Sequence, residues 1–146
     1  MAHAAPVSGI STRTTRPPNL FSDRAHAVGR WAVPLALGLV YGYWAAADRR
    51  YGGPITGWNV LFGFVTTIVF TVVLAAVLAL GPRLRRELHA VLWFAFIGVA
   101  FGFLYGQSGH AILPTVGLSL GIGIVAGLFC FYWFYTHEDA AGHRVG

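Results

Sequence analysis

Four long apolar runs, separated by short polar connections, restrict what this chain can fold into more than any other feature. The runs cover about residues 31–47, 58–80, 88–106 and 111–135. A helix needs about 20 apolar residues to cross a bilayer core of about 30 Å. With 56% hydrophobic and only 10% charged residues, the chain is also too apolar for an ordinary soluble domain. The sequence therefore predicts an all-α fold, an integral membrane four-helix bundle.

Polar sequence lies at both ends of the predicted bundle. Residues 1–27 mix Ser, Thr, Arg and Pro without a periodic apolar face, which is typical of a flexible, disordered tail. We expect the transmembrane domain to cover residues 28–136 and a second, short tail to cover residues 137–146. The chain is therefore predicted to be one membrane domain with a tail on each side of it in sequence.

The distribution of arginine predicts the orientation in the membrane, because short loops rich in Arg or Lys stay in the cytoplasm. One predicted side holds Arg13, Arg16, Arg24, Arg30, Arg83, Arg85, Arg86 and Arg144. The other side holds Arg49 and Arg50. We therefore expect a multi-pass protein of the bacterial inner membrane with both termini cytoplasmic. Arg83, Arg85 and Arg86, in the central turn, are the predicted topology determinants.

The first apolar run has a second interpretation as a secretory signal. A basic leader precedes it, and Ala45-Ala46-Ala47 before Asp48 is typical of a small-residue cleavage site. The run exceeds the usual signal core of about 7–15 residues, which favours a retained helix. Cleavage after Ala47 would remove the first helix, so the mass of the mature chain distinguishes the two interpretations.

Small residues recur at helical spacing in three of the runs, and we interpret them as helix-packing ridges of the glycine-zipper type. Residues four apart lie on one face of a helix, and small side chains let helix backbones approach closely in lipid. The predicted packing residues are Gly63, Thr67, Thr71, Gly98, Gly102, Gly106, Gly117, Gly121, Gly123 and Gly127. The last four form two separate faces, which predicts neighbours on both sides of the fourth helix.

Other side chains of the runs also have structural interpretations. The face of the third run opposite its glycines is bulky and is expected to contact lipid: Trp93, Phe96, Ile97, Phe103 and Leu104. Tyr41, Tyr43 and Trp44 are typical of an interfacial anchor. Thr67 and Thr71 either bond back to a carbonyl one turn earlier, as is usual for helical threonine in lipid, or line a polar path.

One short pattern occurs twice. Gly38-Leu39-Val40-Tyr41-Gly42 near the end of the first run matches Gly102-Phe103-Leu104-Tyr105-Gly106 near the end of the third. Each is followed by a Pro-x-x-Gly that opens the next run. The duplication favours two helical hairpins related by a parallel repeat. Because glycine and aromatic residues are so common here, a chance match is the alternative.

Residues that carry chemistry are scarce. None of the runs has an ionisable group at mid-depth, where carriers and pumps retain one for function. We therefore expect no catalytic, cofactor-binding or metal-binding residues, and we expect that the protein is not an enzyme. A haem or metal site is an alternative at the inner surface, and its candidate ligands are Glu87, His89, His137, Glu138 and Asp139. At the outer surface Gln107, Ser108 and His110 form either a turn or the mouth of a site.

From about Trp31 to Asp139, the chain resembles small four-helix integral membrane proteins of high-GC actinobacteria. The resemblance lies in the all-arginine basic set and the Ala, Gly and Val richness. It also lies in two stretches, Tyr51-Gly52-Gly53-Pro54-Ile55-Thr56-Gly57-Trp58-Asn59 and Tyr135-Thr136-His137-Glu138-Asp139. It implies the fold and the membrane location, and it brings no activity or site residues with it.

The leading functional hypothesis is a structural or accessory role in the membrane. The expected partners are the lipid bilayer and either a second copy of the chain or another membrane protein, and no nucleic acid. The main alternative is a homo-oligomeric pore, holin or small-solute channel, with Thr67, Thr71 and Ser119 as lining. A haem- or metal-binding protein is the third possibility.

Overall fold

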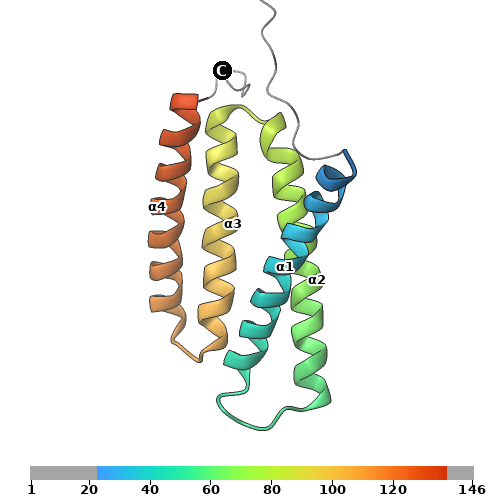
Figure 1. The fold of residues 1–146 in the computed structure, drawn as a ribbon. Coiled ribbons are helices and arrows are strands. Elements are labelled where there is room, and N and C mark those ends of the chain that lie inside the picture. Colours follow the sequence, from blue (N-terminus) through green and yellow to red (C-terminus); the bar gives the residue numbers. More distant parts are fainter. Residues whose placement is uncertain (1–22, 138–146) are drawn as a thin grey trace, which may run out of the picture.

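The computed structural model describes residues 23–137, which form four α-helices joined by short connections (Figure 1). The helices are α1 (Asp23–Arg49), α2 (Gly57–Leu80), α3 (Arg86–Gln107) and α4 (Ile112–His137). The predicted all-α, four-helix architecture is confirmed. The first helix begins at Asp23, well before the predicted Trp31, and the other three lie close to their predicted ranges. The rest of the two predicted tails lies outside the described residues.

Local sequence accounts for where the helices begin and end. The Thr56 hydroxyl accepts a hydrogen bond from the backbone amide of Asn59 (3.2 Å) and so caps α2. Between α2 and α3 the chain makes one 3₁₀ turn, η1 (Gly81–Arg83), with a proline in its first turn. The connection from α1 to α2 reverses through Tyr51 and Gly52, both with positive φ.

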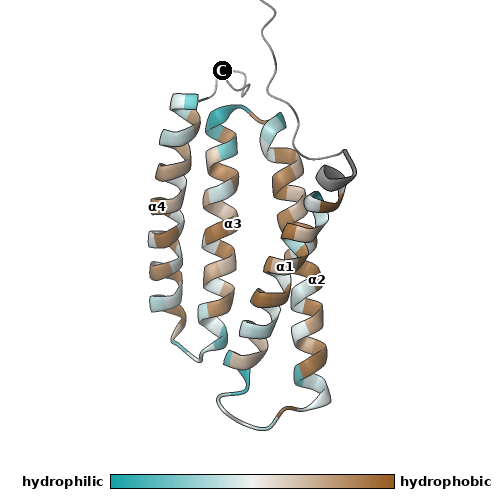
Figure 2. Ribbon diagram, in the orientation of Figure 1, coloured by the Kyte–Doolittle hydropathy of each residue, from teal (hydrophilic) through white to brown (hydrophobic). Residues whose placement is uncertain are grey.

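Hydropathy along the helices matches a protein that sits in a bilayer (Figure 2). Within the described residues, three segments are long and apolar enough to cross a membrane: Gly57–Arg83, Arg86–Gln107 and Ile112–His137. The chain is therefore an integral membrane protein. The sequence predicted four such spans, and α1 is the helix that does not qualify as one among the described residues. It has charged residues toward both ends, and glycines, tyrosines and tryptophans lower the hydropathy of its apolar part.

The helices pair as two hairpins, α1 with α2 and α3 with α4, which meet along α3 (Figure 1). In the first hairpin, Gly38 and Gly42 of α1 lie directly against Thr71 and Thr67 of α2. Gly63 continues the same contact, with Ala46 Cβ 3.1 Å from the point where its own Cβ would lie. Close backbone approach of this kind supplies dispersion contacts between helices in lipid.

Small residues also face the partner helix in the second hairpin. Gly102 of α3 lies against Ser119 of α4, and a Cβ on Gly98 would be 3.3 Å from the Ser119 carbonyl oxygen. On α4, Gly123 and Gly127 lie against Phe94, and a Cβ on Gly127 would be 2.8 Å from the Phe94 Cβ. Each hairpin therefore sets a glycine of its first helix against a hydroxyl residue of its second. The parallel repeat itself stays a prediction.

Three of the predicted packing residues are placed differently. A Cβ on Gly117 or Gly121 would meet nothing within 4 Å, so the second small face of α4 has no neighbour among the described residues. A Cβ on Gly106 would be 3.9 Å from the Thr115 methyl group of α4, so Gly106 faces α4 less closely than Gly102 does. Gly117 and Gly121 therefore face away from the other described helices, and Gly106 lies near the end of α3, beside α4.

The threonines of α2 serve contacts between helices. Thr67 and Thr71 are buried, and the Thr71 hydroxyl donates to the Pro34 carbonyl oxygen of α1 (3.3 Å). The expectation that Thr71 bonds back along its own helix is therefore wrong, because the close approach of α1 brings a second carbonyl within reach. Burial against α1 also removes Thr67 and Thr71 from any water-filled path through one copy of the chain.

Candidate functional site

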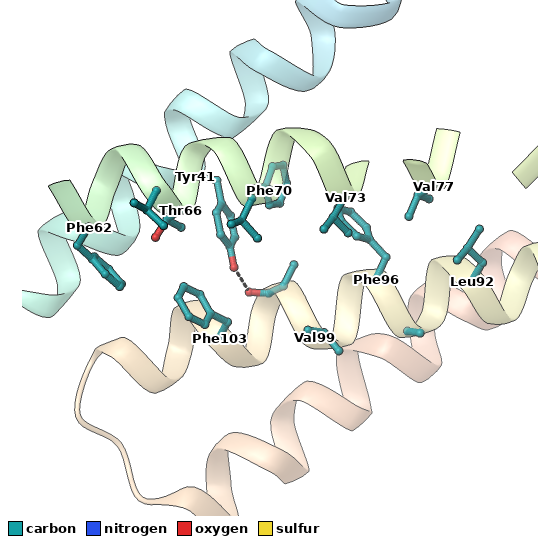
Figure 3. A pocket seen from close by; sticks show the side chains of 14 residues that line it. Tyr41, Phe62, Thr66, Phe70, Val73, Val77, Leu92, Phe96, Val99 and Phe103 are labelled. Atoms are coloured by element: carbon teal, nitrogen blue, oxygen red, sulfur yellow. Dashed lines mark hydrogen bonds between the residues drawn. The ribbon is translucent and has the colours of Figure 1, made fainter. Parts of the chain in front are cut away.

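A cavity of about 590 Å³ lies where the two hairpins meet, between α1 and α2 on one side and α3 on the other (Figure 3). Its walls are Tyr41, Phe62, Val65, Thr66, Val69, Phe70, Val73, Val77, Leu92, Ala95, Phe96, Val99, Ala100 and Phe103. The volume falls within the range of about 300–1,000 Å³ that is typical of ligand pockets. The cavity exists because the helices pack closely within each hairpin and touch less closely between them.

The lining is apolar almost throughout and opens sideways. Several wall residues are largely exposed at the level of the helix mid-sections: Val69 (56%), Val73 (44%) and Val99 (73%). In a bilayer, the space beside these valines is lipid hydrocarbon. The site is therefore a lateral recess that hydrocarbon can enter, and it offers few polar groups to a water-soluble ligand.

Aromatic rings from both sides of the cavity lie in a row along it (Figure 3). Tyr41 stacks on Phe70 with ring centroids 4.2 Å apart, and Phe70 meets Phe96 at 5.5 Å. Phe103 lies 6.4 Å from Tyr41 and 6.3 Å from Phe62. Rings from α1, α2 and α3 thus meet in one continuous contact, and aromatic pairs at these spacings are mutually favourable.

Tyr41 also joins the hairpins by a hydrogen bond. Its hydroxyl donates to the Ala100 carbonyl oxygen of α3 at 2.6 Å, the dashed line in Figure 3. This bond crosses the interface at which the cavity lies. Tyr41 therefore has two roles at once, since its ring forms part of the wall and its hydroxyl holds α3 to α1.

Sequence reasoning missed this site and assigned its residues elsewhere. Phe96 and Phe103 were expected to face lipid, and Tyr41 was expected to be an interfacial anchor; all three line the cavity instead. A usable signal was present, because Phe62 and Phe70 on α2 and Phe96 and Phe103 on α3 are each about two helical turns apart. Two matching aromatic stripes on neighbouring helices are what an aromatic-walled interface requires.

One end of the cavity has a cation beside it. The Arg49 guanidinium lies over the ring of Phe62, a wall residue, at 4.3 Å from the ring centroid. Arg49 is exposed, and among the described residues its side chain has no carboxylate partner within salt-bridge distance. At the opposite end of the helices Arg86 stacks on Tyr135 and pairs with Glu87 (3.2 Å).

Among the described residues, the candidate metal or haem ligands that were predicted at the inner surface do not assemble into a site. His89 stacks on Phe134 of α4 with ring centroids 3.9 Å apart, and its Nε2 accepts a hydrogen bond from the Trp93 indole (3.3 Å). His137 stacks on Trp133 of its own helix. Within residues 23–137, no three His, Cys, Asp or Glu side chains come together as metal ligands. Glu138 and Asp139 lie outside the described residues.

The turn between α3 and α4, which was predicted to lie at the outer surface, makes mainly local contacts. The His110 ring stacks on Tyr105 at 4.0 Å, and the Gln107 side-chain amide donates to the Phe103 carbonyl oxygen (3.4 Å). Tyr51, from the other hairpin, lies directly against Gly109. Gln107 and His110 thus contact their own hairpin, and none of the outer-turn residues belongs to the cavity wall.

Comparison with known proteins gives one partial likeness. The chain is 37% identical over 60 residues to a lipoprotein signal peptidase from Streptomyces coelicolor. The matched stretch is 41% of this chain and 29% of the length of that protein. No protein-family model matches the chain, and no solved structure matches it.

This likeness corrects one expectation from the sequence. We predicted that the protein is not an enzyme, and the match to a peptidase contradicts that prediction. The structure adds a constraint on the chemistry. Asp48 lies near the end of α1 and Glu87 near the start of α3, at opposite ends of the bundle (Figure 1). These two carboxylates therefore do not form a pair.

Proposed function

We propose that this integral membrane protein binds the hydrocarbon chain of a bilayer lipid in the cavity between its hairpins. The observation that carries the proposal is the cavity itself: about 590 Å³, walled by apolar and aromatic side chains of three helices. Along α2 it runs from Phe62 to Val77, which is about 22 Å at a rise of about 1.5 Å per residue. One leaflet of the hydrocarbon core is about 15 Å thick, so an acyl chain fits along it.

Concavity distinguishes this recess from the ordinary lipid-facing surface of a helix. A chain lying in it contacts α2 and α3 together with the Tyr41 ring of α1, so it gains more dispersion contacts than a chain on one convex helix. The aromatic row makes that wall rigid, because its rings support one another. A bound lipid is therefore expected to stay with the protein when detergent replaces the surrounding bilayer.

Filling the cavity tests the proposal. In Val69→Trp the indole is expected to occupy the recess and to lower the lipid retained after detergent exchange by about half or more. The control is Val125→Trp, the same change at an exposed position of α4 that is 69% accessible and outside the cavity wall. Retained lipid is extracted and quantified by mass spectrometry. Equal retention by the two variants and the wild type would overturn the proposal.

The proposed lipid binding is compatible with an accessory role, in which the protein acts as a small membrane subunit beside a partner in the bilayer. Affinity purification from mild detergent, with identification of the co-purifying proteins, tests for such a partner. The free small face at Gly117 and Gly121 supports a contact with another helix. For the pore alternative, Thr67 and Thr71 are buried against α1 and do not line a path through one copy of the chain. The Ser119 hydroxyl donates to the Thr115 carbonyl oxygen of its own helix.

Cleavage of a signal peptide is a second candidate function, favoured by the 37% identity over 60 residues to the lipoprotein signal peptidase. A lipid-binding recess is compatible with a substrate that carries lipid. Incubation of the purified protein with a lipoprotein precursor, followed by mass spectrometry of the products, tests this candidate. An Asp48→Asn variant, which removes the carboxylate near the end of α1, indicates whether that group takes part.

We also propose that the end of the bundle with the η1 turn faces the bacterial cytoplasm. Arg83, Arg85 and Arg86 gather there, and α1 begins and α4 ends at the same end (Figure 1). Reporter fusions at Gly146 and near Gly53 are expected to give a cytoplasmic and a periplasmic signal, respectively. A periplasmic signal from the fusion at Gly146 would contradict this orientation. Kinship with the small actinobacterial membrane proteins likewise stays a proposal.

A further inference from the structure

We propose that the lipid held by this protein is an anionic glycerophospholipid whose phosphate is bound by Arg49. This inference rests on the proposed lipid-binding function and adds the class of headgroup. One acyl chain lies in the cavity, and the headgroup lies at the end where the Arg49 guanidinium stacks on the wall residue Phe62, 4.3 Å from its ring centroid.

Among the described residues, the Arg49 guanidinium at that end of the cavity has no salt-bridge partner. Asp48 precedes Arg49 in the chain, yet no carboxylate of the described residues lies within 4.0 Å of the Arg49 guanidinium. Phe62 covers one face of the guanidinium, which leaves its N–H edges for another acceptor. A planar guanidinium can give two parallel hydrogen bonds to a phosphate. Arg50 follows directly and adds a second positive charge nearby.

The other end of the bundle is a poorer place for the same headgroup. Arg86 is turned toward α4, where it stacks on Tyr135 and donates to the Glu87 carboxylate at 3.2 Å. A phosphate there would compete with that carboxylate. Tyr135 is not a wall residue of the cavity, whereas Phe62, the ring that Arg49 covers, is one. Among the described residues, an arginine therefore stacks on the cavity wall at the Arg49 end, and this contact favours that end for the headgroup.

The test uses the full chain in mixed micelles containing equal amounts of phosphatidylglycerol and phosphatidylcholine with the same acyl chains. Lipid retained after chromatography is quantified by mass spectrometry. The wild type is expected to retain the anionic lipid in about fivefold excess, which corresponds to one interfacial arginine acting on an anionic lipid. Arg49→Gln is expected to lose most of this preference while keeping its total retained lipid, and Arg49→Lys is expected to keep part of it.

Arg83→Gln is the matched control, because it changes the net charge equally at the opposite end of the bundle. It is expected to keep the preference of the wild type. The inference is overturned if Arg49→Gln keeps the full preference, or if Arg83→Gln loses as much of it. Inorganic phosphate added without lipid is expected to bind no better to the wild type than to Arg49→Gln, since the acyl chain supplies the affinity.

Failure of the headgroup assignment and failure of the lipid-binding function give different results. If Val69→Trp lowers total retained lipid and Arg49→Gln leaves the ratio of the two lipids unchanged, the cavity binds lipid and the role of Arg49 is wrong. If Val69→Trp retains as much lipid as the wild type, the cavity is not the binding site and both proposals fall.

Discussion

A Gly42→Ala variant is expected to be strongly destabilised in detergent, although it adds a single methyl group. The new Cβ would lie 2.5 Å from the Gly63 carbonyl oxygen and 2.9 Å from the Thr67 backbone nitrogen, and directly against the Thr67 hydroxyl. Two of these three obstacles are backbone atoms of α2, so the whole helix must move away from α1. Overpacking of this kind costs about 1–3 kcal/mol. The measurement is the free energy or midpoint of unfolding.

Gly121→Ala supplies the control for this prediction. The substitution is the same and also lies inside an apolar helix, but a Cβ there meets nothing within 4 Å. It is expected to leave stability unchanged or to raise it slightly, since alanine has the higher helix propensity. Should Gly42→Ala prove as stable as Gly121→Ala, α1 does not pack on α2 as described.

Loss of the Tyr41 side chain is expected to loosen the junction between the hairpins. Tyr41→Ala removes both the stacking on Phe70 and the hydrogen bond to the Ala100 carbonyl oxygen. Truncating a large aromatic residue lowers the free energy of unfolding by about 3 kcal/mol at the low end of the usual range. We expect a value near this low end, because Tyr41 borders a cavity and is only partly surrounded by protein. Tyr41→Phe keeps the ring and loses only the hydroxyl, at an expected cost of about 0.6 kcal/mol in a membrane protein.

The distance between the hairpins reports the same effect independently of stability. Spin labels at Ile68 of α2 and Val125 of α4, both largely exposed, allow that distance to be measured by pulsed electron paramagnetic resonance. Tyr41→Ala is expected to broaden the distance distribution, and Tyr41→Phe is expected to leave it close to that of the wild type. A distribution in Tyr41→Ala as narrow as in the wild type would show that other contacts hold the hairpins together.

The helices could be predicted from the sequence because their signal is local. Runs such as 58–80 are long and apolar enough to be recognised alone, and Gly81-Pro82 marks where α2 ends. The start of α1 was harder to place, because Asp23 to Arg30 is helical but polar, so hydropathy gave no sign of it. Hydropathy indicates which residues lie in the bilayer core, and it does not show whether a helix continues into the polar residues that flank them.

The aromatic stripes of α2 and α3 were a signal for an interface between these helices, but the cavity itself could not be predicted, because it depends on where the two hairpins leave space between them. Phe103 follows Gly102, and a helical projection correctly places it away from the neighbour that Gly102 contacts. The Phe103 side was expected to contact lipid, whereas the Tyr41 ring of α1 lies on that side of α3. A single helix does not specify what lies on its second side. Arg49 was likewise interpreted only as a topology charge, since its contact with Phe62 depends on how α1 and α2 pair.

The division into two hairpins has a consequence for how the protein is made. Each hairpin joins helices adjacent in sequence, so the first can close in the membrane while the ribosome is still translating the second. The recess takes shape only when the second hairpin docks on the first, at the Tyr41–Ala100 contact. Before the hairpins dock, the two walls of the recess are separate surfaces, and both are in contact with the acyl chains of the bilayer. Under the proposed function, an acyl chain can therefore occupy the recess as the two hairpins come together, in the last step of assembly.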